Sequence, residues 1–458
     1  MELEEILNRA VRLGARYADV RYQRYEYELI TIENQELRSY ESRSLTGVGI
    51  RVITSGVGFA STSILTDKGM EAALRRAINA SKTMEGGIAL APIEAVEAEE
   101  RLKVKMDPLE EPPEEKVSLA MDANKAAWVS DEIRNAVTML SISRDLRIYV
   151  STEGGRVTVE TTLVGLGHES VARVEGVMER VWHGESLCSG YEFLKQRDWG
   201  SFTEELSHLA LEAAASKTPP PGTYPVVVDP NVVGLLLHEA FGHASEGDIV
   251  HSGDSVLRGR VGERVASSLV TIVDEGVVEG GYYHPYDDEG VKKGRTIIVE
   301  KGILKGYLHD RTSAQRLEGE PTGNGRAQDY ESSPIVRQTN YYMEPGDHTL
   351  EELLEDIELG VYVRGVGGRG GQVETGMGTF TFSVGPSKMI RRGELAETVR
   401  GVIISGFILE TLKTIDAVGR DLKIRTSVFG GCGKMGQRVR VGYGGSHVRV
   451  RRMTVGGR

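Results

Sequence analysis

NVVGLLLHEAFGHASEGD, residues 231–248, is the stretch around which the predicted fold is organised. Directly before it, residues 224–228 read as a short β-branched strand. Asp229-Pro230 is typical of a helix start, with Asp as N-cap and Pro in the first turn. The helix that follows is apolar on nearly every face, which indicates that it lies inside the domain. The sequence therefore predicts a buried strand that leads directly into a buried helix.

Three polar residues, His238, Glu239 and His243, form a His-Glu-x-x-x-His hexad at the end of this helix. Buried polar groups need partners, so the hexad fits either a metal site or two histidines hydrogen-bonded with Glu239. On a regular helix, residues five apart point roughly 140° away from each other, which would separate the two imidazoles. Gly242 lets the backbone loosen, and we predict a break or a π-type bulge over Phe241–His243.

A catalytic zinc site needs a third protein ligand beside the two histidines. Glu246, Asp248, His251 and Asp254 follow closely in the sequence. Cys432 is distant, but it lies in GGCGKMGQ, where the glycines would let the backbone approach a crowded site. Because a lone cysteine is commonly just a small buried apolar residue, the residues alone leave the third ligand open.

Several further motifs occur in a fixed order along the chain. They are HEAFGHASEGD (238–248), YDDEG (286–290), IVEKGILKGYLHD (298–310), GNGR (323–326), CGKMGQ (432–437) and MTVGG (453–457). With these motifs the chain resembles the TldD/PmbA family over essentially its whole length. Within the family it resembles the TldD branch of zinc metalloproteases, because the partner branch lacks the hexad.

The resemblance implies one zinc ion (Zn2+) per chain, with His238, His243 and Cys432 as its ligands. It also implies that Glu239 is the catalytic carboxylate. Cys432 is thereby favoured over the nearby carboxylates, which leaves Glu246 to orient a histidine ring.

The implied activity is zinc-dependent hydrolysis of peptide bonds in unfolded polypeptides or small peptides that enter an enclosed cleft. An extended peptide that adds to an exposed strand edge would explain weak sequence preference. The implied assembly is a dimer with a related TldE/PmbA-like subunit, or a homodimer. Two alternatives stay open: a non-catalytic peptide-binding or regulatory subunit, and a metal-dependent hydrolase of non-peptide amides.

The composition is that of a globular protein, with 458 residues of which 40% are hydrophobic and 27% charged. The net charge of -12 argues against nucleic acid as a partner, because phosphate binding depends on Lys and Arg. No apolar run is long enough for a membrane span, and the N-terminus reads as an acidic amphipathic helix. We therefore expect no membrane partner and a cytoplasmic location.

The length predicts two domains, with TPPPG at 218–222 as the boundary. We expect an α+β fold, in which residues 1–217 form an N-terminal α/β-sandwich-like domain with a connector at about 84–113. Residues 222–458 then form a C-terminal catalytic domain, β-rich because glycine is frequent, that carries the strand-to-helix metal motif.

Periodicity predicts the main elements. Helices are expected from residue 3 to Gly14 and over 67–82, 114–129 and 202–216. Between residues 18 and 63 we expect three strands, over 20–32, 47–53 and 57–62. Alternating strands are expected over 136–183 with a hairpin turn at 153–155, and further strands over 267–273, 296–299 and 303–308.

Three other features have open interpretations. His284 and the carboxylates at 287–289 could bind a metal, but a loop whose carboxylates cap the backbone is favoured. The glycine-rich run 365–378 fits either substrate-facing backbone or simple β-turns. Residues 438–441 and 448–451 alternate Arg with Val, which predicts that the arginines form the solvent-exposed face of a strand pair.

Overall fold

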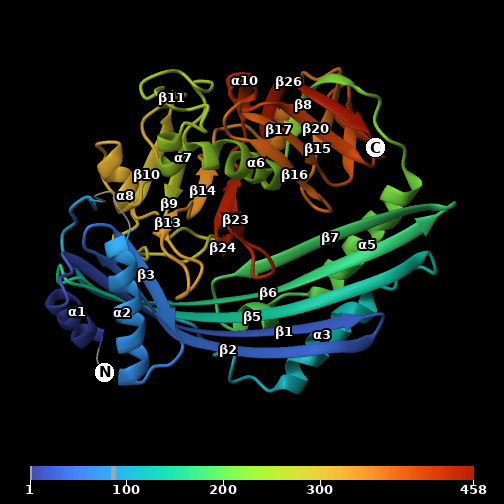
Figure 1. Cartoon of the computed structure of the whole chain (residues 1–458). Helices are drawn as coiled ribbons and strands as arrows, with labels where there is room; N and C mark the ends of the chain where they lie inside the picture. The colour runs from blue at the N-terminus through green and yellow to red at the C-terminus, as the bar shows by residue number, and fades with distance from the viewer. Residues whose placement is uncertain (1–2, 84–88, 458) are drawn as a thin grey trace.

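The computed structural model describes residues 3–83 and 89–457. Its long N-terminal strands form a curved sheet, and the β-rich C-terminal half lies over one side of that sheet (Figure 1). The predicted α+β class is confirmed. The first part of the predicted connector, residues 84–88, falls outside the described residues.

The N-terminal sheet has seven strands in the order β3-β2-β1-β5-β6-β4, with β7 also paired to β6. Its strands are β1 Tyr17–Glu33, β2 Glu36–Ile53, β3 Val57–Thr62, β4 Glu97–Arg101, β5 Ile133–Ser151, β6 Arg156–Val174 and β7 Val177–Leu187. All neighbours are antiparallel except β4, which runs parallel to β6. The predicted turn at 153–155 joins β5 to β6, and Gly154 supplies the positive φ of 91° that the turn requires.

Helices cover this sheet at two places. They are α1 Leu3–Arg12, α2 Asp67–Thr83, α3 Pro113–Ala126, α4 Glu192–Gln196 and α5 Trp199–Ala215. The first two pack in one apolar cluster with β1 to β3, and α3, α4 and α5 pack in a second cluster with β1, β5, β6 and β7. The predicted helices are thus present, with ends that differ by a few residues.

Two larger sheets organise the C-terminal half. The nine-stranded sheet contains β8 Gly222–Val228, β15 Leu359–Val363, β16 Gly370–Glu374, β17 Thr379–Ser383, β18 Ser387–Arg391, β19 Glu394–Val399, β20 Val402–Phe407, β21 Ile415–Val418 and β26 Val448–Gly457. The six-stranded sheet contains β9 Ile272–Glu275, β10 Arg295–Glu300, β11 Ile303–Leu304, β14 Asn340–Met343, β22 Lys423–Thr426 and β25 Gly442–Gly445.

Short elements complete this half. Two small hairpins pair β12 Gly325–Arg326 with β13 Ile335–Val336 and β23 Cys432–Lys434 with β24 Gln437–Val439. The helices are α6 Pro230–Leu236, α7 Gly247–Ser252, α8 Arg311–Arg316, α9 Leu350–Leu354 and α10 Ile408–Lys413.

Two strand predictions need correction. The expected strand 267–273 begins only at Ile272, because residues 267–270 form a turn in which Val270 N donates to Ser267 O. The two arginine-valine stretches do not pair with each other. The turn at Met435 and Gly436, both with positive φ, folds β24 back onto β23, while β26 pairs with β8, β20 and β21.

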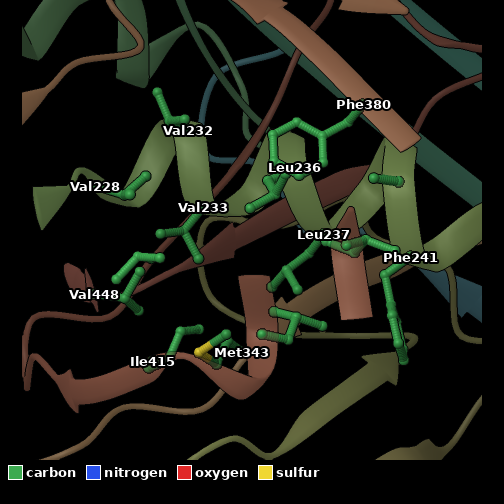
Figure 2. Close-up of a cluster of buried hydrophobic side chains, with 14 of the residues drawn as sticks. Val228, Val232, Val233, Leu236, Leu237, Phe241, Met343, Phe380, Ile415 and Val448 are labelled. Atoms are coloured by element: carbon green, nitrogen blue, oxygen red, sulfur yellow. The ribbon is translucent and has the colours of Figure 1, made fainter. Parts of the chain in front are cut away.

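The helix α6 lies in the core of the C-terminal half, as its apolar faces predict. Val232, Val233 and Leu236 pack with residues from both larger sheets, such as Val448 and Met343 (Figure 2). The core therefore encloses the segment that carries the hexad. Within the described ranges, no helix is both long and apolar enough to cross a bilayer.

Candidate metal centre

The hexad lies where the helix changes its winding. After α6, residues Leu237–Gly242 form a π-helical turn and His243–Ser245 a 3-10 turn. His243 N donates to His238 O, so the hydrogen bond spans five residues rather than four. The wider turn brings residues five apart onto one face. The predicted π-type irregularity is confirmed, although it begins at Leu237 rather than at Phe241.

Gly242 is required by a close approach at this turn. Gln338 Nε2 donates to His238 O at 3.0 Å, and a Cβ on Gly242 would lie 2.1 Å from Gln338 Oε1. Because Gly242 has no side chain, the amide of Gln338 has room to donate its hydrogen bond to the π turn.

Three buried ligand-type side chains meet beside this turn. The rings of His238 and His243 have centroids 5.3 Å apart, and Cys432 Sγ lies 3.1 Å from His243 Nε2. One ligand atom from each of the three residues lies within 4.8 Å of the other two. Cys432 arrives here because it opens the β23–β24 hairpin, which reaches down between the two halves (Figure 1).

The partners of these side chains fit a metal ion. His238 is 3% exposed, and neither its Nδ1 nor its Nε2 has a hydrogen-bond partner. Burial opposes ionisation of the Cys432 thiol, but the nearby His238 and His243 outweigh it and lower the thiol pKa to about 5. A thiolate with two imidazoles is a donor set that zinc prefers. An unpaired buried imidazole next to a thiolate is costly unless a cation joins them.

The other side of His243 is held by charged residues. Its Nδ1 lies 3.0 Å from Glu246 Oε2, and Lys434 Nζ lies 2.8 Å from the same carboxylate. Burial alone would raise the pKa of Glu246, but Lys434 and His243 lower it to about 2. Glu246 is therefore ionised and can only accept a hydrogen bond, so His243 Nδ1 donates to it and Nε2 is left facing Cys432.

Glu239 points to the same place from the π turn. Its Oε2 lies 3.9 Å from His243 Nε2, and 36% of the side chain is exposed. A carboxylate that is near the ligand group yet reachable by solvent can exchange protons with a bound substrate.

The remaining nearby candidates do not join this cluster. Asp248 forms an ion pair with Lys434 at 2.7 Å, and His251 and Asp254 are exposed. Glu246 contacts His243 rather than lying among the three ligand-type side chains.

The carboxylates at 287–289 stabilise the loop that contains them. Asp287 accepts hydrogen bonds from the backbone N–H groups of residues 289, 291 and 325. Asp288 pairs with Arg147, and Glu289 pairs with Arg51. These contacts agree with the favoured interpretation, in which the carboxylates cap the backbone.

Two residues of the site were not singled out from the sequence. Lys434 lies two positions after Cys432 in the CGKMGQ motif, and this position in the motif could have indicated it. Gln338 has no such signal, because its role depends on a contact with a residue 100 positions away.

The glycine-rich run forms an edge of the larger sheet. Its strand β16 pairs only with β17 among the strands of the described chain, and it lies next to the π turn. One edge of β16 is therefore open near the three ligand-type side chains.

Comparison with protein families gives three matches along the chain. Residues 18–81 match the PmbA/TldA metallopeptidase domain 1, residues 107–216 the central domain, and residues 221–457 the C-terminal domain.

Individual relatives cover nearly the whole chain. A metalloprotease of Methanothermobacter thermautotrophicus is 37% identical over 96% of this chain and 95% of its own length. A zinc metalloprotease TldD homolog of Saccharolobus solfataricus is 32% identical over 98% of this chain and 99% of its own length. The solved structure of TldE from Thermococcus kodakarensis covers 99% of both chains with a TM-score of 0.84 at 20% identity, which shows a shared fold.

Proposed function

The chain belongs to the TldD/PmbA family of metallopeptidases, and from this premise we propose that it is a zinc-dependent peptidase. The proposed substrates are unfolded polypeptides or small peptides. The observation that carries the proposal is the buried imidazole of His238, which has no hydrogen-bond partner and lies beside His243 and an acidic thiol.

In this proposal His238, His243 and Cys432 hold the zinc, one ion per chain. When bound, zinc supplies a Lewis acid that activates water and polarises a substrate carbonyl. Glu246 and Lys434 keep His243 in the tautomer whose Nε2 is free to act as a ligand.

Glu239 is the proposed general base and acid. Its carboxylate takes a proton from the attacking water and returns it to the leaving amine nitrogen. Its partly exposed position on the π turn supports this role, because one carboxylate must meet both water and substrate.

The open edge of β16 is the proposed place for the substrate backbone. A peptide that adds there as an extra strand would be held by main-chain hydrogen bonds, which do not depend on the side chains of the peptide. The glycines of this run leave the edge uncovered. Only extended peptides could bind in this way, which agrees with unfolded polypeptide as the substrate.

We also propose that the chain assembles with a related subunit or with a second copy of itself. The likeness of its fold to TldE supports a partner of similar shape. Light scattering on the purified chain tests the homodimer, and co-expression with a related subunit tests the heterodimer.

The first experiment measures the metal content of the purified chain by mass spectrometry. Cys188 is a matched control, because it is a second free cysteine and burial raises its thiol pKa to about 12. We expect near-stoichiometric zinc in the wild type and in Cys188→Ala, and a sharp fall in Cys432→Ala. Zinc retained in Cys432→Ala would move the third ligand to a carboxylate such as Glu246.

The catalytic role is tested separately. Glu239→Gln should keep its zinc and lose cleavage of an unfolded polypeptide, because the amide cannot take up a proton. Wild-type cleavage in this variant would contradict the assignment. A wild-type chain without zinc, even after reconstitution, would instead favour a peptide-binding subunit.

A further inference from the structure

A cavity of about 570 Å³ lies between the N-terminal sheet and the C-terminal half. Strands β1, β5 and β6 form one wall, and the loops around residues 282–288 and 326–330 form another. Val439 of β24 also lines it, whereas the paired residue Cys432 belongs to the candidate metal centre. The hairpin β23–β24 is thus a shared wall, and the cavity is a different site. Its size is typical of pockets for small molecules.

Most of the arginines that line this cavity have no carboxylate partner. Of the five arginines that line it, Arg147 pairs with Asp145 and Asp288. The other four have no ion pair with a carboxylate anywhere in residues 3–83 and 89–457: Arg21, Arg326 and Arg440 donate to main-chain oxygens, and Arg438 is exposed.

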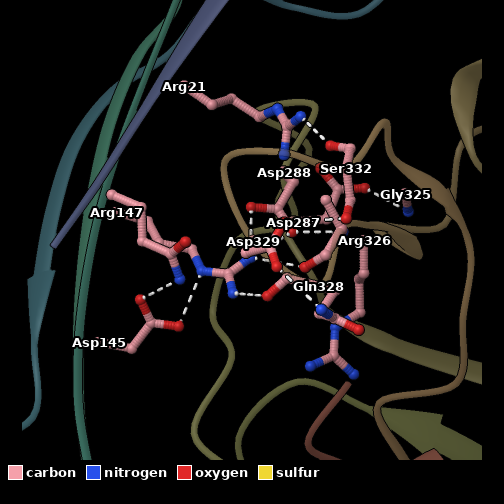
Figure 3. Close-up of polar contacts among 12 residues, drawn as sticks. Arg21, Asp145, Arg147, Asp287, Asp288, Gly325, Arg326, Gln328, Asp329 and Ser332 are labelled. Atoms are coloured by element: carbon pink, nitrogen blue, oxygen red, sulfur yellow. Dashed lines mark hydrogen bonds and ion pairs between the residues drawn. The ribbon is translucent and has the colours of Figure 1, made fainter. Parts of the chain in front are cut away.

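Arg326 shows this imbalance most clearly. It is 3% exposed, and its guanidinium donates only to the main-chain oxygens of Gln338 and Arg440. In Figure 3, dashed lines join Arg147 to the carboxylates of Asp145 and Asp288, but none joins the guanidinium of Arg326 to a carboxylate. Burial lowers the pKa of Arg326 to about 10, which reflects the cost of a desolvated cation.

The two other acidic residues of the cavity, Asp287 and Asp329, form no ion pair with these four arginines among the described residues. Burial and the neighbouring Glu289 raise the pKa of Asp287 well above its usual value, and its carboxyl oxygens accept hydrogen bonds from the backbone N–H groups of residues 289, 291 and 325. The carboxylate of Asp329 accepts hydrogen bonds within its own turn, from Glu331 N, Ser332 Oγ and Gln328 Nε2. A buried cation without a counter-charge is costly, and a bound anion would remove that cost.

The rest of the wall suits an organic body. Six tyrosines line the cavity, at positions 22, 25, 149, 282, 286 and 330. The ring of Tyr282 lies under Arg326, 5.5 Å from its guanidinium carbon. Apolar side chains of β6, including Val157 and Leu163, complete the lining. Flat aromatic and apolar surfaces next to guanidinium groups that lack a carboxylate partner fit a molecule with one charged end.

We propose that this cavity binds a small organic anion. Its carboxylate or phosphate group pairs with Arg326 and Arg440, and its aromatic or apolar body lies against the tyrosine rings. The site is independent of zinc and of peptide hydrolysis, so it stands even if the proposed activity fails.

The test is calorimetric titration of the metal-stripped full chain with benzoate, phenyl phosphate and benzyl alcohol. Removing the metal excludes binding of the anions to zinc. We expect at least one anion to bind at least tenfold more tightly than benzyl alcohol, its neutral counterpart, which corresponds to about 1.4 kcal/mol. Tighter binding of benzoate would identify a carboxylate ligand, and tighter binding of phenyl phosphate would identify a phosphate ligand.

Three variants locate the binding. Arg326→Gln and Arg440→Gln should each weaken binding of the anion at least tenfold. Arg392→Gln is the matched control, because its side chain is 88% exposed and should leave binding unchanged. If Arg326→Gln does not fold, the binding measurement on Arg440→Gln is the test, because Arg440 is only half-buried. Absence of binding by both anions, or unchanged binding in the cavity variants, would overturn the proposal.

Discussion

At the scale of single residues, the orientation of His243 depends on a short chain of charges. Lys434 holds Glu246, and Glu246 accepts the hydrogen bond from His243 Nδ1. The three side chains are no more than 10% exposed, so the field between them is little screened. A histidine whose ring is fixed in this way binds a metal without first losing rotational freedom.

Glu246→Gln tests this arrangement. The amide is neutral and loses both the ion pair with Lys434 and the strong acceptor for His243, so zinc affinity should fall about 10–100-fold. The affinity is measured by competition with a chelator of known zinc affinity. Glu263→Gln, at an exposed carboxylate paired with Arg260, is the control and should bind zinc as the wild type does. Equal affinity in the two variants would exclude a positioning role for Glu246.

The sequence indicated part of this site. The hexad identified His238 and His243, and the resemblance to a known family favoured Cys432, which does come within reach of both. Gln338 could not be predicted, because nothing local distinguishes it and its contact with His238 O is created by the packing of β14 beside the π turn. Residues that act through distant contacts lack a local pattern.

At the scale of elements, the π turn is the feature that makes the hexad spacing workable. Gly242 has helical dihedral angles, so alanine would fit its backbone and would even favour a helix. The glycine is needed only because Gln338 approaches so closely. The requirement is therefore steric and can be tested by removing either partner.

Gly242→Ala should lower the free energy of unfolding by about 1–3 kcal/mol, as overpacking does. In a Gln338→Ala background the same change should cost almost nothing, because the overlapping atoms are gone. Denaturant unfolding of the four proteins in this cycle measures the difference. Gly294→Ala, where a Cβ meets nothing within 4 Å, is the control. An equal cost in both backgrounds would show that the close contact with Gln338 is not the reason for the glycine.

The long strand β6 carries a buried histidine that makes the sheet sensitive to acid. His168 is fully buried between Thr138 and Ser170, and burial lowers its pKa to about 3. The unfolded chain therefore binds a proton between pH 6.5 and 3 that the folded chain does not bind. Stability is present above pH 6.5 and is lost as the pH falls below it.

His168→Gln should remove this contribution. Between pH 7 and pH 5 the wild type should lose about 2 kcal/mol more unfolding free energy than the variant. Urea unfolding at several pH values gives the two curves. His208→Gln, on the exposed face of α5, should leave the pH dependence of the wild type unchanged. Parallel curves for wild type and His168→Gln would contradict the effect.

In β2 the strand prediction succeeded over the continuously buried apolar end and missed the exposed half. The apolar end of β2, residues 47–53, was predicted, but the strand begins at Glu36 because its first half pairs with β1 while staying largely exposed. In β24, the alternation of Arg and Val correctly predicted a strand, but the sequence did not predict its partner strand. The pairing with β23 depends on the turn at Met435 and Gly436. Hydrophobic periodicity reports burial, and pairing is decided by contacts elsewhere.

At the scale of the whole molecule, ion pairs are among the contacts that join the two halves. The three largest apolar clusters of the described chain each lie in one half, and only small clusters, such as that of Tyr149, Val157 and Tyr286, cross between them. Arg51 of β2 bridges the halves, pairing with Asp19 of β1 and with Glu289 of the C-terminal half, both at 2.6 Å. Its side chain is 6% exposed, and the two carboxylates are almost fully buried.

Arg51→Met should therefore destabilise the whole chain strongly. The thioether fills similar space but leaves two carboxylates buried without a cation, which costs about 3–5 kcal/mol for a broken buried pair. Arg391→Met is the matched control, because Arg391 also pairs with a carboxylate at 2.6 Å but both side chains are about half exposed. An exposed pair contributes about 0–1 kcal/mol. Denaturant unfolding compares the two variants, and an equal loss in both would mean that the charged contacts between the halves do not hold them together.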